Sequence, residues 1–161
     1  MTTHVSDEQV RHWIDDGVVQ NVTSHSSSSS SEETEFNFEL QLSTLPIHLI
    51  KEGAWGPIRV VGRNGFDTDR TKALLRDDQQ RGELLSYIGP MLAATPGFYT
   101  FLDEEGTSSP IEYAETLQIE YRIYPDEASQ QALMDAVMAI GTSMRYVQNV
   151  VAVLGAAESG E

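Results

Sequence analysis

Histidine is the side chain best suited to acid–base and metal chemistry near neutral pH. The chain has four histidines: His4, His12, His25 and His48. No two of them have a metal-binding spacing such as that of the HExxH motif. The sequence around His12 predicts the exposed side of a helix, and the sequence around His48 predicts the polar face of a strand. We therefore expect each histidine to be solvated and none to be catalytic.

Clustered carboxylates are the second candidates for chemistry, because they can bind divalent cations. The segment DTDRTKALLRDD, which starts at Asp67, opens like a calcium-binding loop. It has Lys72 where that loop requires glycine, so it is not such a loop. Acids also stand together at residues 77–78 and 103–105, but such clusters are expected in a chain with 25 acidic residues. The sequence therefore predicts no metal site.

Other catalytic motifs are missing from the sequence. Cysteine is absent, which excludes disulfides, thiolate metal sites and cysteine nucleophiles. There is no phosphate-binding glycine loop and no GxSxG motif. We predict no catalytic residue and no cofactor, and we expect a protein that is not an enzyme. One alternative stays open, namely an enzyme or small-ligand-binding protein whose site assembles from residues far apart in the sequence.

The charge of the chain indicates its habitat and limits its partners. The 25 acidic and 10 basic residues give a net charge of −15, and only Lys51 and Lys72 are lysines. Self-repulsion of this size weakens a compact state in dilute buffer, whereas the Debye length falls to about 3 Å in 1 M salt. This composition is typical of the salt-rich cytoplasm of halophilic archaea, although a merely acidic protein is an alternative. The scattered arginines form no basic run, so we expect no nucleic-acid partner.

The length of 161 residues is sufficient for one domain with a hydrophobic core. We expect a single domain over residues 1–161, with its core within residues 5–155. The serine tract predicts a flexible loop over residues 24–33, and the last residues, 156–161, predict a disordered tail. The N-terminal sequence MTTHVSDEQV lacks the charged and apolar regions of a signal peptide, which predicts a cytoplasmic location.

Hydrophobic periodicity predicts the secondary structure. A helix is expected over residues 7–16, with Ser6 as its N-cap and Gly17 as its stop. Alternation of apolar and polar residues predicts strands in EFNFELQL, PIHLIKE, PIRVVGR, GFYTFLD and IEYAETLQIEYRIY, and VVQNVT is a further candidate. Helical spacing predicts a short helix near residues 68–76 and a longer one near 78–94, which Pro90 kinks rather than ends.

The C-terminal segment from 133 to 154 carries an apolar stripe with alternating spacings of four and three. Its members are Leu133, Val137, Ile140, Met144, Val147, Val151 and Leu154. A membrane span is disfavoured because Asp135 and Arg145 lie inside the segment. A coiled coil is also disfavoured, because the positions beside the stripe are uncharged. We expect the helix to cover a sheet of its own chain, with a homodimer through flanking residues such as Met138, Val150 and Val153 as the alternative.

The predicted fold is α+β with two layers, an antiparallel sheet packed by helices in the order α-β-β-β-α-β-β-α, and a long C-terminal helix. This element order, with WIDDG, FNFELQL, PIHLI, IRVVG, FYTF and LQIEYRIY at these places, resembles a known group. That group comprises archaeal domains of unknown function with a type III secretion chaperone-like fold, and it is similar to bacterial sensory-transduction regulators. The resemblance implies a domain that dimerises and binds protein segments, without catalytic residues.

The function predicted from these observations is that of a non-enzymatic protein-interaction module, adaptor or chaperone-like, from a halophilic archaeon. The expected partner is a protein that the sequence does not identify, and no membrane is expected. The candidate partner surface consists of Trp55 in its turn and of Met138, Tyr146 and Val150 on the last helix. The alternative for each of these four residues is that it simply completes the core.

Overall fold

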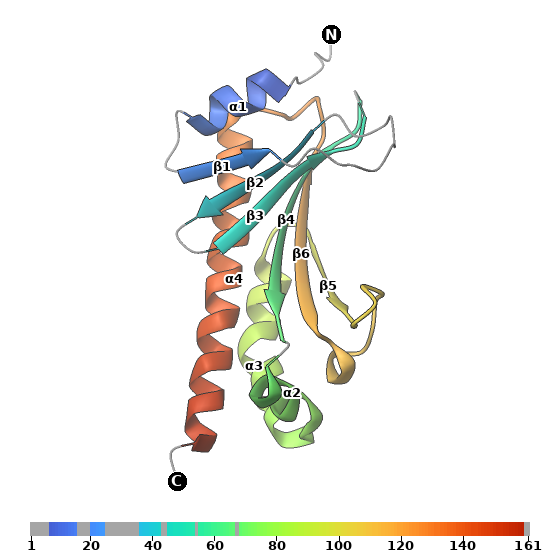
Figure 1. The fold of residues 1–161 in the computed structure, drawn as a ribbon, viewed down its shortest axis with the longest axis vertical. Helices are drawn as coiled ribbons and strands as arrows, with labels where there is room; N and C mark the ends of the chain where they lie inside the picture. Colours follow the sequence, from blue (N-terminus) through green and yellow to red (C-terminus); the bar gives the residue numbers. More distant parts are fainter. Residues whose placement is uncertain are drawn as a thin grey trace. The chain divides into compact units, whose positions relative to one another are not determined.

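The computed structural model describes residues 7–15, 20–24, 36–42, 45–53, 55–66 and 68–159. The chain divides into two compact units. The first comprises residues 1–62 and 120–141, and the second comprises residues 63–119 and 142–161. Two strands and the last helix run through both units, so the backbone enters and leaves each unit more than once (Figure 1).

The secondary structure is a mixture of helices and strands, and it confirms the predicted α+β class with an antiparallel sheet and a long C-terminal helix. The hydrogen-bonded strand order is β1 (Gln20–Ser24), β2 (Phe36–Leu42), β3 (Leu45–Lys51), β4 (Ile58–Gly65), β6 (Thr116–Ile123) and β5 (Phe98–Leu102). The candidate strand in VVQNVT is present as β1, and the segment between β4 and β5 holds two helices, as its spacing predicts. Ser24 belongs to β1 rather than to the expected serine loop, whose other residues lie outside the described ranges.

The first unit contains α1 (Asp7–Asp15), β1 (Gln20–Ser24), β2 (Phe36–Leu42), β3 (Leu45–Lys51), the start of β4 (Ile58–Gly65), the end of β6 (Thr116–Ile123) and the start of α4 (Gln130–Ser159). Its sheet is antiparallel and alternates as predicted. Leu40 pairs with Ile47 and Phe38 pairs with Leu49, and all four side chains are buried. Val10 and Ile14 are fully buried, so α1 buries the apolar face of an amphipathic helix.

The second unit contains α2 (Asp69–Arg76), α3 (Asp78–Ala94), β5 (Phe98–Leu102) and the short 3-10 helix η1 (Ile111–Tyr113), with the remaining parts of β4, β6 and α4. Asp77 both ends α2 and caps α3, because its Oδ1 accepts from the backbone N–H of Gln80 at 3.0 Å. This confirms the predicted break. Pro90 lies inside α3 and does not end it.

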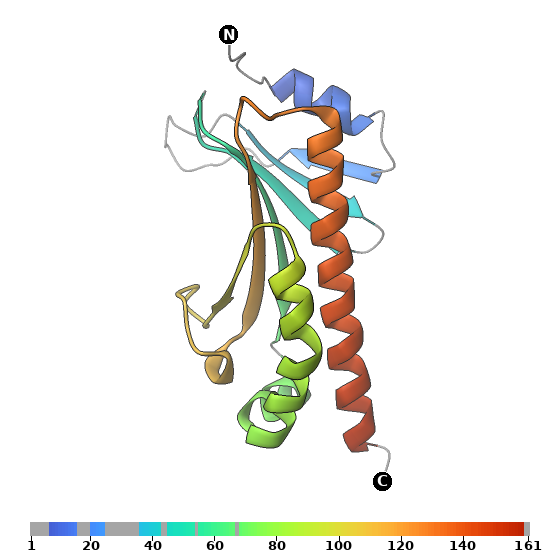
Figure 2. The same ribbon diagram turned by 180° about the vertical axis from the view of Figure 1, so that it is seen from behind.

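The long helix α4 buries most of the predicted stripe. Leu133, Val137, Ile140, Met144 and Val147 are fully buried, whereas Val151 and Leu154 are only partly buried. By length and composition the segment Gln130–Gly155 could also cross a membrane, but a core helix meets the same criteria. The expected tail over residues 156–161 is wrong for its first part, because α4 continues to Ser159 (Figure 2). Alanine and glutamate favour helix, which agrees with the extension.

Candidate functional site

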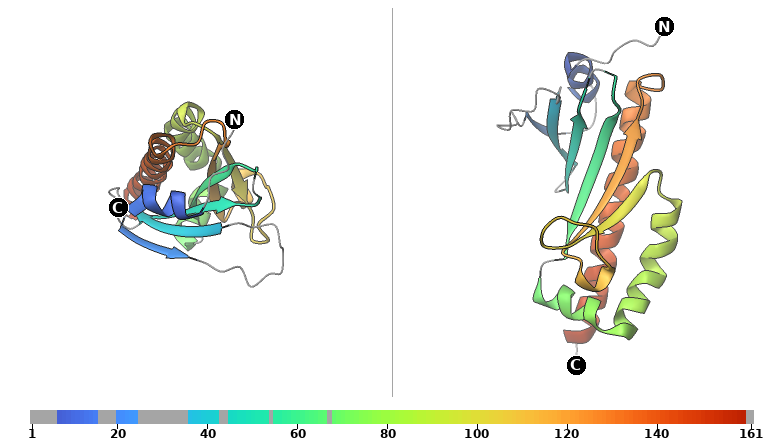
Figure 3. Two further views of the ribbon diagram at one scale, coloured as in Figure 1. Left: turned by 90° about the horizontal axis from the view of Figure 1, so that it is seen from above. Right: turned by 90° about the vertical axis from the view of Figure 1, so that its right-hand side faces the viewer.

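A groove between α3 and the C-terminal part of α4, in the second unit, is lined mainly by apolar side chains. It has a volume of about 510 Å³. Its lining consists of Glu83, Tyr87, Tyr146, Asn149, Val150, Val153 and Leu154. We call it the α3–α4 groove. Figure 3 shows α3 and α4 running alongside each other in this unit.

Helical periodicity explains why these side chains share one surface. Glu83 and Tyr87 are four residues apart on α3 and therefore lie one above the other on one face. On α4, Tyr146, Val150 and Val153 follow the same i, i+4, i+7 rule. The fully buried stripe occupies the neighbouring face of α4, so the groove residues stand at the edge of the core rather than within it.

One hydrogen bond links the two walls of the groove. The hydroxyl of Tyr146 donates to the backbone carbonyl oxygen of Tyr87 at 3.2 Å. This bond ties α4 to α3 at that level. Both rings remain accessible, with 50% of Tyr87 and 40% of Tyr146 exposed, and Val153 is 66% exposed. Exposed apolar side chains gathered in a hollow mark interaction sites on soluble proteins.

The chemistry of the groove is that of binding. Its described lining offers two phenol rings, three aliphatic side chains, the amide of Asn149 and the carboxylate of Glu83. The described lining contains no histidine, serine or lysine. Within the described parts of the chain, no group of three or more histidine, aspartate or glutamate residues could hold a metal ion. The groove can therefore bury apolar groups and pair one positive charge with Glu83.

The structure brings together two of the four predicted surface residues. Tyr146 and Val150 both line the α3–α4 groove. Sequence reasoning missed Tyr87, which comes from a different helix. The available signal was its i, i+4 spacing from Glu83 on the outer face of the helix predicted near residues 78–94.

The other two predicted residues belong to the first unit. Met138 is on the exposed side of α4, with 51% of its surface accessible. Trp55 is 66% exposed in the turn that joins β3 and β4. It lines a second hollow, of about 500 Å³, together with Tyr124, Pro125 and Asp126.

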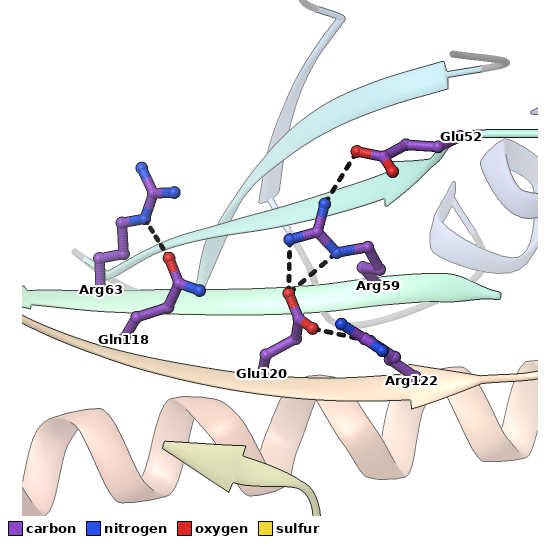
Figure 4. A network of polar contacts seen from close by, with 6 residues as sticks. All are labelled: Glu52, Arg59, Arg63, Gln118, Glu120 and Arg122. Carbon is purple, nitrogen blue, oxygen red and sulfur yellow. Dashed lines mark hydrogen bonds and ion pairs between the residues drawn. The ribbon is translucent and has the colours of Figure 1, made fainter. Parts of the chain in front are cut away.

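The polar face of the first unit carries a network centred on the buried carboxylate of Glu120 (Figure 4). Arg59 on β4 donates to Oε1 of Glu120 from Nε at 2.9 Å and from Nη2 at 2.6 Å. Arg122 donates from Nε to Oε2 at 2.8 Å. Arg59 also donates from Nη1 to Glu52 at 3.0 Å. Both oxygens of Glu120 thus have charged donors, as a buried carboxylate requires.

This network has a structural role in the sheet. The hydrogen bond and the charge of Glu120 raise the pKa of Arg122, so the guanidinium stays protonated beside the carboxylate. Since Glu120 accepts from two guanidinium groups, it is not available as a general base. In the second unit, Arg63 makes a simpler contact, donating from Nε to Oε1 of Gln118 at 2.9 Å (Figure 4).

An ion pair of the second unit joins α2 to the segment before β6. Lys72 and Glu115 lie 2.9 Å apart. The hydrogen bond and the charge of Glu115 raise the pKa of Lys72. Lys72 stands where a calcium-binding loop would require glycine. In the structure it takes part in a surface ion pair.

Comparison with known proteins supports the fold and leaves the activity open. No protein-family model matches the chain, and no curated protein matches it. A solved structure of an uncharacterized protein from Methanothermobacter thermautotrophicus is similar, with a TM-score of 0.68 and 14% sequence identity. The match covers 91% of this chain and 96% of that chain. At this identity the likeness concerns the fold alone.

Proposed function

We propose that the protein is a non-enzymatic interaction module, adaptor or chaperone-like, that holds an apolar segment of a partner protein in the α3–α4 groove. The observation that carries this proposal is the exposure of Tyr87, Tyr146 and Val153 within one hollow. The predicted resemblance to chaperone-like domains that bind protein segments agrees with it.

The proposed occupant is an amphipathic helix with a lysine or arginine beside its apolar face. Apolar residues at helical spacing would enter the groove, as in other helix-in-groove complexes. Glu83 is the charged residue of the described lining, and the chain carries a net charge of −15, so a basic segment is attracted and an acidic one repelled. The same repulsion disfavours a second copy of this chain as the occupant.

We place this module in the cytoplasm of a halophilic archaeon. The net charge of −15 with only two lysines supports that habitat. A high salt concentration screens long-range charge interactions and makes apolar burial the main attraction, which suits a groove lined by tyrosine, valine and leucine. A contact pair between Glu83 and a basic side chain of the occupant is screened much less.

The test compares two charge-introducing variants of α4 in affinity capture at 2 M KCl. Val153→Glu places a carboxylate in the groove, and Gln148→Glu places one at an exposed position of the same helix outside the groove lining. We expect wild type and Gln148→Glu to retain the same partner and Val153→Glu to lose it. Overlapping peptides of that partner should then locate a basic amphipathic segment as the bound part.

Three outcomes would contradict the proposal. Equal capture by Val153→Glu would remove the groove from the interaction. A metabolite or metal ion that copurifies and is released on denaturation would favour the alternative of a ligand-binding protein or enzyme. Light scattering that shows a wild-type dimer and a monomeric Val153→Glu variant would assign the groove to a second copy of the chain.

A further inference from the structure

The first unit has a hollow whose chemistry differs from that of the α3–α4 groove in the second unit. It is lined by Trp55, Tyr124, Pro125 and Asp126 and has a volume of about 500 Å³. Trp55 is 66% exposed and Tyr124 is 52% exposed, so two large aromatic faces are accessible beside one carboxylate. We call it the Trp55–Tyr124 hollow.

Both aromatic residues stand in hydrogen-bonded turns. In the turn that carries Trp55, the N–H of Gly56 donates to the carbonyl oxygen of Gly53 at 3.2 Å. The buried side chain of Lys51 donates from Nζ to the same oxygen at 2.7 Å. A lysine buried at the end of β3 thus anchors the turn, which limits the positions that Trp55 can adopt.

The turn that carries Tyr124 is held in the same way. The N–H of Glu127 donates to the carbonyl oxygen of Tyr124 at 3.0 Å, and Pro125 occupies the second position, where its φ suits the turn. Asp126 is therefore presented on the same short turn as Tyr124. An arrangement held before binding avoids the cost of ordering the site when a ligand arrives.

The charged group of the described lining is the carboxylate of Asp126, while the ammonium of Lys51 lies buried beneath the Trp55 turn and donates to the carbonyl oxygen of Gly53. Arg122, two residues before Tyr124, has its charge paired with Glu120, whose Oε2 lies 2.8 Å from Arg122 Nε. Asp126 and Glu127 follow as exposed acids, and within the described parts of the chain neither makes an ion pair. The faces of tryptophan and tyrosine attract cations through their quadrupoles, most strongly for tryptophan.

We infer that the Trp55–Tyr124 hollow is a binding site for an alkylammonium group. Trp55 and Tyr124 supply the aromatic faces, and Asp126 supplies the opposite charge. The group is carried either by a lysine or methylated lysine side chain of a protein or by a free quaternary ammonium compound. Both sources present the same positively charged methyl or methylene surface. This inference uses the first unit only and does not depend on the α3–α4 groove.

The test uses two-dimensional NMR of the full chain, in which the indole N–H of Trp55 reports on the hollow. Trp13 is the other tryptophan and serves as an internal control. The probes are a short peptide with trimethyllysine, the same peptide with the uncharged carbon isostere of that side chain, and tetramethylammonium chloride. We expect the Trp55 signal to shift with both cationic probes and the Trp13 signal to stay in place. Tighter binding of the trimethyllysine peptide than of tetramethylammonium would indicate that the natural ligand is a protein side chain. Equal binding of the two would indicate a free quaternary ammonium compound.

Matched variants separate the aromatic and the ionic contributions. Tyr124→Leu should weaken binding of the cation about two- to fivefold, the usual size of an exposed cation–π contact. Asp126→Asn should weaken it by a similar factor and reduce its salt dependence. Glu127→Gln removes the same charge one residue away, outside the lining. It should weaken binding of the cation clearly less than Asp126→Asn does.

Two results would overturn the inference. Equal shifts with the charged peptide and its uncharged isostere would show an apolar hollow without preference for cations. Equal shifts of Trp13 and Trp55 would show unspecific binding. Val153→Glu should leave the titration unchanged, so failure of this site and failure of the groove are distinguishable.

Discussion

Arg59 holds Glu120 through two hydrogen bonds that end on the same carboxylate oxygen, at 2.9 Å from Nε and 2.6 Å from Nη2. The two residues are 61 positions apart in the sequence and lie on β4 and β6. Glu120 is buried, and Arg122 donates a hydrogen bond to its second oxygen. The pair therefore links two strands of the first unit through a charge that is costly to leave unpaired.

Replacement of Glu120 by alanine should destabilise the protein strongly. Removal of one partner of a buried ion pair costs about 3–5 kcal/mol, and the low end is expected because Arg59 and Arg122 keep contact with solvent. Chemical denaturation followed by circular dichroism measures the change. The control, Glu105→Ala at an exposed position, should change stability by less than about 0.5 kcal/mol. Similar values for both variants would show that the network contributes little.

The stripe of α4 makes a second prediction. Ile140→Ala removes a fully buried side chain and should cost about 2–5 kcal/mol through lost burial and the remaining cavity. Val153→Ala, on the same helix but 66% exposed, should cost less than about 0.5 kcal/mol. Thermal unfolding of both variants checks this difference. A neutral Ile140→Ala variant would be incompatible with the buried stripe.

The junction of α2 and α3 depends on Asp77. Its Oδ1 accepts from the N–H of Gln80, so Asp77→Ala leaves that donor without its cap and should cost about 1 kcal/mol. Asp77→Asn keeps an acceptor oxygen and should be close to neutral. Urea denaturation of the two variants distinguishes loss of the cap from loss of the charge: equal destabilisation would point to the charge.

Salt should stabilise the protein because it screens the repulsion among 25 acidic residues. We expect the melting temperature to rise steadily between 0.2 M and 2 M KCl. Equal effects of KCl and NaCl would identify screening as the cause. A melting temperature that is constant or falls over this range would contradict the proposed high-salt habitat.

Local periodicity makes several features of the fold predictable from the sequence. Alternation in β2 and β6 and the three-and-four spacing of α4 predict which side chains face the core, because strands and helices repeat every 2 and about 3.6 residues. Leu117, Ile119 and Ile123 are buried on one side of β6, in agreement with that pattern, whereas Tyr121 is half-buried there. Glu120 departs from the pattern, because it is buried on the polar side. The break at Asp77 was predictable for the same reason, since capping is a local hydrogen bond.

Contacts between residues far apart in the sequence follow from how the helices and strands pack. Tyr146 reaches the carbonyl oxygen of Tyr87 across 59 positions, and no local pattern encodes that distance. The turns that present Trp55 and Tyr124 are likewise separate in the sequence, and they line one hollow because β4 and β6 are hydrogen-bonded neighbours in the sheet. Propensity and periodicity act over a few residues, whereas a binding surface depends on how the elements pack.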